Sequence, residues 1–123
     1  QEPRVMYLKA LILHTENETE AALALALEAL EVKPLTELFD LISFCYNQLG
    51  QYEQAAKWRF YLALFYLHSG EVEKSRTTYA QAVEQFGAAT AVEIGAVDEL
   101  KELRDQGIQV EAANKILDLY WTR

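Results

Sequence analysis

The feature that most constrains the fold is a series of apolar residues that recurs at helical spacing and stops at a glycine. Large and small side chains alternate in it, in the order Phe39-x-x-Ile42-Ser43-x-x-Tyr46, followed by Gly50, Tyr52 and Ala55. Spacings of three and four residues place side chains on one face of a helix, and a glycine supplies the left-handed turn that ends it. The pattern is typical of stacked helix pairs and favours a binding scaffold over an enzyme.

The composition indicates an all-α protein. The chain has 123 residues, of which 51% are hydrophobic, and only two prolines interrupt it, Pro3 and Pro34. Alanine, leucine and glutamate dominate, and these residues lose little side-chain freedom in a helix. A chain of this length can bury a core of its own, and no linker divides it. We therefore expect one domain over residues 1–123. The sequence begins at Gln1 rather than at a methionine, and we interpret it as an excised part of a longer protein.

The apolar spacing predicts six to seven helices. A first helix is expected to end near His14, and Thr15-x-x-Glu18 resembles a capping box that would open the second. Proline at 34 and glycines at 50, 70 and 107 separate the later ones. The expected helices cover residues 5–14, 15–32, 35–49, 52–68, 71–86 and 90 or 96 to 106, with a last one after Gly107.

The net charge narrows the choice of partner. The formal charge is −8, from eleven basic residues scattered among nineteen acidic ones. Nucleic acid binding requires clustered lysine and arginine, so we expect no nucleic acid partner. An acidic surface favours a basic partner through long-range attraction, although it also serves solubility alone. The longest apolar stretch is far shorter than the roughly 20 residues that cross a bilayer, so no membrane span is expected.

The chain has no pattern of residues typical of catalysis or of metal binding. Cys45 lies among apolar residues and is expected to be a buried, unreactive thiol. His14 and His68 each precede a turn, where an imidazole can satisfy terminal carbonyls. There is no phosphate-binding loop, no Cys-His cluster and no nucleophile elbow. We expect no catalytic residue, no cofactor and no metal.

The hairpins resemble the tetratricopeptide repeat family. One unit follows the family pattern at Phe39, Ile42, Ser43, Tyr46, Gly50, Tyr52 and Ala55. An earlier unit matches at Leu13, Asn17, Ala22, Ala26, Ala29 and Pro34, and a later one at Leu62, Ala63, Tyr66, Gly70, Ser75, Tyr79 and Ala82. The resemblance covers about residues 4–87 and implies a right-handed stack of antiparallel helix hairpins, an α-solenoid, with residues 88–123 as a capping region. One departure is that Gly50 and Gly70 are only twenty residues apart, so the helix between them has to close one unit and open the next.

The resemblance also implies a site. Members of the family bind a peptide or a partner helix in a groove lined by the first helices of successive units. The corresponding positions give an apolar groove with an acidic edge, formed by Tyr7, Leu11, Glu37, Asp40, Phe44, Asn47, Phe60, Tyr61 and Leu64. A basic amphipathic helix suits this chemistry, whereas carboxylate capture does not, because acids and Phe44 replace the cations it needs.

Three roles remain open at this stage. The chain can bind a partner protein in trans, pack in cis against another domain of its parent protein, or self-associate through the aromatic pair Tyr120 and Trp121. The groove aromatics can also be core residues that pack on neighbouring helices. A plug formed by residues 108–123 can fill the groove.

Overall fold

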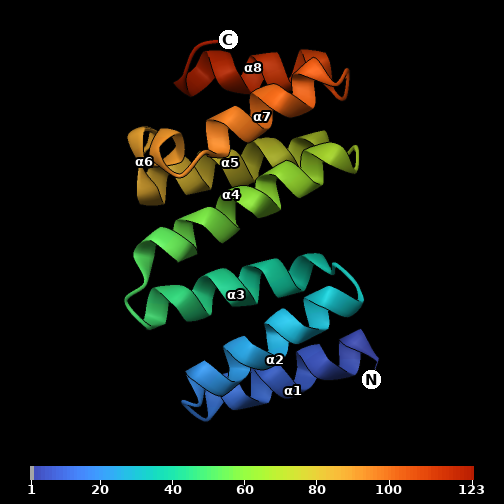
Figure 1. Cartoon of the computed structure of the whole chain (residues 1–123), viewed down its shortest axis with the longest axis vertical. Helices are drawn as coiled ribbons and strands as arrows, with labels where there is room; N and C mark the ends of the chain where they lie inside the picture. Colours follow the sequence, from blue (N-terminus) through green and yellow to red (C-terminus); the bar gives the residue numbers. More distant parts are fainter. Residues whose placement is uncertain (1) are drawn as a thin grey trace. The chain divides into compact units, whose positions relative to one another are not determined.

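The computed structural model describes residues 2–123, and Gln1, on which the interpretation as an excised part depends, lies outside them. These residues form eight α-helices (Figure 1). Their bounds are α1 Pro3–Thr15, α2 Thr19–Val32, α3 Thr36–Gln48, α4 Tyr52–His68, α5 Val72–Phe86, α6 Ala88–Glu93, α7 Ala96–Asp105 and α8 Val110–Tyr120. The prediction of an all-α fold built from helix hairpins is confirmed. The number of helices, eight, exceeds the predicted six to seven.

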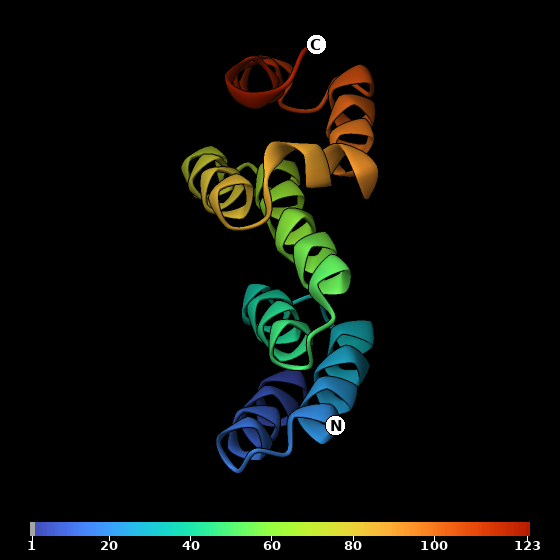
Figure 2. The same cartoon turned by 90° about the vertical axis from the view of Figure 1, so that its left-hand side faces the viewer.

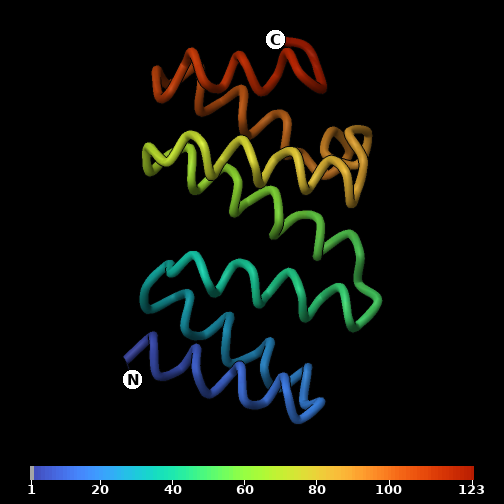
Figure 3. The backbone as a smooth tube through the Cα atoms, turned by 180° about the vertical axis from the view of Figure 1, so that it is seen from behind, coloured from blue at the N-terminus to red at the C-terminus, as the bar shows by residue number. Residues whose placement is uncertain are grey.

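The helices group into two compact units, one ending at Trp58 and the other covering Arg59–Arg123. In the first unit α1 packs on α2, and both pack on α3. Figure 2 shows α1 and α2 side by side, and Figure 3 follows the same hairpin from behind. The single domain over residues 1–123, capped by residues 88–123, stays a prediction.

The turn between α1 and α2 differs from the predicted capping box. Thr15 is the last residue of α1, and its hydroxyl donates to the carbonyl of Ile12 at 2.8 Å. Asn17 takes the left-handed conformation, with φ 64°, and the amide of Glu18 donates to the Leu13 carbonyl at 2.8 Å. This is the hydrogen-bond pattern of a helix that ends on a left-handed residue. The Glu18 side chain makes no capping bond, so the capping-box prediction is wrong.

The second hairpin repeats the first with a shift of 33 residues. Helix α3 begins at Thr36 against Pro3 for α1, and α4 begins at Tyr52 against Thr19 for α2. The left-handed residue also shifts by 33, since Gly50, with φ 76°, stands where Asn17 stands in the first turn. The register between α1 and α3 therefore pairs each residue of α1 with the residue 33 positions later.

Helix α4 closes one hairpin and opens another, as the spacing of Gly50 and Gly70 requires. It is one continuous helix with a left-handed glycine turn at each end. In the first unit the buried Ser43 hydroxyl donates to the Ala55 carbonyl at 2.8 Å. In the second unit the buried Ser75 hydroxyl donates to the Ala63 carbonyl at 2.7 Å. Both serines thus bind to the backbone of α4, from α3 in one unit and from α5 in the other.

The core of the first unit combines small residues of α2 with larger ones of α1 and α3. Its buried members are Met6, Ala10, Ala22, Leu23, Ala26, Ala29, Leu35, Leu38, Leu41, Ile42 and Cys45. Alanines let the helix backbones approach closely, and each buried leucine or isoleucine contributes about 1.5–3 kcal/mol. Burial raises the pKa of the Cys45 thiol, which disfavours the reactive thiolate. The prediction of a buried cysteine is confirmed.

The second unit contains the extra helix. Gly95 takes the left-handed conformation, with φ 85°, and separates α6 from α7 where one helix was expected. Helix α8 buries Ala113, Ile116 and Leu117 and packs on α5 and α7. The apolar face of the last helix is thus used within its own unit.

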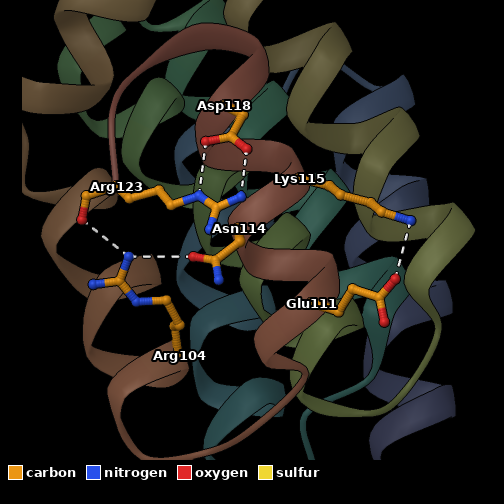
Figure 4. A network of polar contacts seen from close by, with 6 residues as sticks. All are labelled: Arg104, Glu111, Asn114, Lys115, Asp118 and Arg123. Atoms are coloured by element: carbon orange, nitrogen blue, oxygen red, sulfur yellow. Dashed lines mark hydrogen bonds and ion pairs between the residues drawn. The ribbon is translucent and has the colours of Figure 1, made fainter.

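The C-terminal residues fold back on this unit. The Trp121 indole N–H donates to the Ala88 carbonyl at 2.9 Å, and its ring meets Tyr79 edge-on. Polar contacts also hold the chain end (Figure 4), where Arg123 donates to both carboxylate oxygens of Asp118 at 2.9 and 3.0 Å. Arg104 donates to the Arg123 carbonyl at 3.0 Å. Trp121 therefore has a structural role inside the unit, and self-association through it stays a prediction.

None of the helices in residues 2–123 has both the length and the apolar content that crossing a membrane requires.

Candidate functional site

A hollow of about 270 Å³ lies between α1 and α3 in the first unit. Its wall is mostly apolar, with two carboxylates at the edge. The lining residues are Tyr7, Leu11 and His14 from α1 and Glu37, Asp40, Leu41 and Phe44 from α3. The hollow thus lies between the first helices of two successive hairpins.

The 33-residue register explains why these side chains converge. Tyr7 and Leu11 occupy the same helical positions as Asp40 and Phe44, and they lie on the same face of their helices. Residues four apart share a face, so each helix contributes one stripe to the hollow. Arg4 and Glu37 are also equivalent, and they form an ion pair across the two helices at 3.0 Å.

Glu37, at the acidic edge, is ionised at neutral pH. The pKa of Glu37 lies below its usual value, chiefly because its own backbone N–H hydrogen-bonds the carboxylate, and further because Arg4 and Thr36 donate to it. The pKa of the Tyr7 phenol is raised, first by burial and then by the negative charges of Glu37 and Asp40. Tyr7 therefore stays a neutral hydroxyl beside two carboxylates.

Phe44 is the main apolar group of the hollow. It is 52% exposed, although it stands on a helix whose neighbouring positions are buried. An aromatic side chain buries about 150–250 Å² when it is fully covered. Covering the exposed half would remove about 100 Å² from water, which is worth about 2.5 kcal/mol. Phe44 is thus the most exposed apolar side chain that lines the hollow.

His14 was not predicted to belong to the site. Its ring meets Phe44 edge-on, with centroids 5.0 Å apart and planes at 84°. Its Nδ1 atom is buried and, within the described residues, has no hydrogen-bond partner. The predicted capping role is therefore not observed at this atom. The helical spacing could have predicted that His14 lines the hollow, because His14 lies three residues after Leu11 and seven after Tyr7, on the same face.

The structure gathers most of the predicted groove but not all of it. Tyr7, Leu11, Glu37, Asp40 and Phe44 line one hollow. Asn47 is half-buried one turn beyond Phe44 and is not among the lining residues.

The remaining predicted residues belong to the second unit. Phe60 is only 2% exposed and packs against Tyr79 in that core, so the prediction that it lines a groove is wrong. Tyr61 and Leu64 are half-buried, and Leu64 packs against the same core. Trp58, at the end of the first unit, packs against the core there and against Phe39.

A second hollow, of about 420 Å³, lies elsewhere in the first unit and shares no lining residue with the first. Residues of α2 and of the end of α3 line it, namely Glu20, Leu23, Ala24, Leu27, Tyr46, Leu49 and Gln51. It has no exposed aromatic comparable to Phe44, and its sequence pattern did not predict a site.

The comparison with protein families supports the hairpin assignment. Residues 3–34, which contain α1 and α2, match the family model of the tetratricopeptide repeat. No curated protein and no solved structure shows a significant match to the chain. The recognition of a tetratricopeptide-like helical repeat is confirmed. Repeats of this family generally mediate protein–protein interactions and serve as non-catalytic modules.

Proposed function

We propose that the first unit binds a partner protein by taking an amphipathic helix or peptide of that partner into the hollow between α1 and α3. The observation that carries the proposal is Phe44, an aromatic that is 52% exposed in an apolar hollow edged by Glu37 and Asp40. An exposed aromatic that lines a hollow differs from one on a convex surface, because an apolar group of a partner can enter the hollow and enclose it. A partner that covers it gains the apolar burial.

The carboxylates at the edge of the hollow favour a basic partner. An apolar anchor would fill the hollow, and a lysine or arginine beside it would meet Glu37 and Asp40. The Arg4 side chain is already paired with Glu37 at 3.0 Å, so a cation of the partner would share this carboxylate with Arg4. The chain's net charge of −8 adds long-range attraction for a basic segment.

The size of the hollow limits what it can hold. A cavity of about 150 Å³ accommodates benzene, so about 270 Å³ suits one large anchor or two smaller ones. Specific interfaces usually bury about 1,200–2,000 Å² in total, so the partner must also contact the rims of α1 and α3. The anchor supplies affinity and the rim supplies selectivity.

A selection from displayed helical peptides tests this proposal, with the full chain as target and fluorescence anisotropy as readout. The selected peptides should carry aromatic or aliphatic anchors next to lysine or arginine. Phe44→Ala should weaken binding by at least about tenfold, since the anchor contact is worth about 2.5 kcal/mol and 1.4 kcal/mol corresponds to a factor of ten.

Tyr52→Ala is the matched control, because Tyr52 is an aromatic of the same unit that is 63% exposed, against 52% for Phe44, and does not line the hollow. It should leave binding unchanged. Asp40→Asn should lower affinity mainly at low salt, because screening removes the contribution of an exposed charge. Equal affinities of the Phe44→Ala variant and the unsubstituted chain would refute the proposal.

A further inference from the structure

Helix α1 has apolar side chains on a face that nothing in its unit covers. Val5, Leu8 and Ile12 are 45%, 57% and 57% exposed, and their spacing of three and four residues places them in one stripe. Met6 and Ala10 face the core, and Tyr7 and Leu11 face the hollow. A helix with apolar side chains on more than one face is normally covered on more than one side.

The internal repeat shows what covers the equivalent face of α3. In the 33-residue register Val5, Leu8 and Ile12 correspond to Leu38, Leu41 and Cys45. These three residues are 0%, 6% and 0% exposed and belong to the core that α3 shares with α1 and α2. The face that is exposed on the first hairpin is therefore covered on the second, by the hairpin that precedes it.

We infer that the stripe Val5–Leu8–Ile12 is a docking surface for a further helical hairpin, which packs on α1 as the hairpin α1–α2 packs on α3. The inference goes beyond the proposed function, because it uses a different face of α1 from the hollow. The partner's second helix would carry small residues at the spacing of Ala22, Ala26 and Ala29, which lie at 0% exposure in α2.

Two positions at which α1 differs from its equivalent α3 define the partner more closely. Lys9 stands where α3 has the fully buried Ile42, and Glu16 stands where α3 has Leu49. Both charged residues are exposed and flank the stripe. The apolar contact on α1 is thus narrower than that on α3, and the docking hairpin would place a carboxylate opposite Lys9.

A second copy of this chain does not offer the required face. The alanines of α2 are already buried within their own unit, so a copy cannot present them to the stripe, although it can pair its α1 stripe with the same stripe. Such a pairing would juxtapose the exposed apolar residues but leave the small-residue helix unused. The register therefore favours a separate hairpin.

A second copy of the chain's own first hairpin can serve as the probe that tests this inference. A second copy of residues 3–35 is placed directly before Pro3 of the full chain, in the register that joins α2 to α3. The junction is compatible with proline, because Leu35 has the extended conformation, φ −82° and ψ 136°, that the residue before a proline prefers. Hydrogen exchange of the α1 amides in the inner copy is measured beside that of the natural chain.

The account expects exchange at the inner Leu8 and Ile12 amides to slow by at least about tenfold, because their side chains become buried and local opening becomes harder. Leu8→Glu with Ile12→Glu in the inner copy should abolish this protection. The same pair of substitutions in the natural chain should leave its melting temperature nearly unchanged, since both residues are exposed there. Lys9→Ile in the inner copy should increase the protection.

Three results would overturn the inference. One is exchange that does not slow in the extended chain. Another is protection that persists after the two glutamate substitutions, because the added hairpin would then bind elsewhere. The third is a dimer of the natural chain in sedimentation that Leu8→Glu with Ile12→Glu converts to a monomer, because a second copy would then cover the stripe.

Discussion

Substitution of Gly50 tests the turn on which the 33-residue register depends. Gly50 has φ 76°, and a Cβ atom built on it would have no other atom within 4 Å. The cost of Gly50→Ala is therefore a cost of backbone conformation alone, with no steric clash added. A non-glycine residue in the left-handed region costs about 1–2 kcal/mol. We expect the free energy of unfolding to fall by that amount.

The equivalent turn supplies the control. Asn17 has φ 64° in the same position of the first hairpin, and asparagine tolerates this region better than alanine. Gly50→Asn should therefore cost less than Gly50→Ala. In the reverse direction, Asn17→Gly should raise stability by roughly 0.5 kcal/mol or more, since it removes the residual strain.

Urea denaturation followed by far-ultraviolet circular dichroism measures these differences. The midpoint should shift in the order glycine, asparagine, alanine at position 50, with an unchanged dependence on urea concentration. For a chain of this size the alanine variant should also melt roughly 4–8 °C lower. Equal stabilities of the alanine and asparagine variants, or no loss for alanine, would refute the equivalence of the two turns.

Three further predictions concern single contacts. Ser75→Ala should lower the free energy of unfolding by about 1 kcal/mol in urea denaturation, because the buried bond to the Ala63 carbonyl is lost; an unchanged midpoint would contradict this. Trp121→Phe should cost at least about 1 kcal/mol in the same assay, because an aromatic ring is kept but the N–H bond to Ala88 and part of the packing of the larger indole are lost, whereas a gain in stability would contradict it. The pKa of Glu37 is lowered in the fold, so its ionised form stabilises the fold above pH 4.5, the ordinary pKa of a glutamate, and this contribution is lost as the pH falls through the folded-state pKa. On acidification the Glu37→Gln variant should therefore lose less stability than the unsubstituted chain, by a few tenths of a kcal/mol. Parallel profiles of stability against pH would count against this prediction.

The sequence predicted the helices best where glycine or proline ends them. Pro34, Gly50 and Gly70 each separate helices at the expected place, because each imposes a backbone conformation that is nearly independent of packing. The turn at Asn17 was misread because Thr15-x-x-Glu18 fits a capping pattern, while a left-handed asparagine is a weaker signal than glycine. The break at Gly95 was noted but not resolved into two helices.

The site residues could be predicted from the sequence where the 33-residue register between α1 and α3 alone brings them together. Tyr7, Leu11, Asp40 and Phe44 converge because they occupy equivalent positions of two equivalent helices. Phe60 was misplaced because α4 is apolar on most of its circumference, and spacing does not reveal which face of such a helix is exposed.

The chemical shifts of the full chain, recorded while a selected basic amphipathic peptide is added, test the central claim most directly. We predict that the largest chemical-shift changes fall on Leu11, Asp40 and Phe44, with little change at Tyr52. The Phe44→Ala substitution should abolish these changes. Changes centred on residues of the second hollow, such as Leu27 and Tyr46, would contradict it.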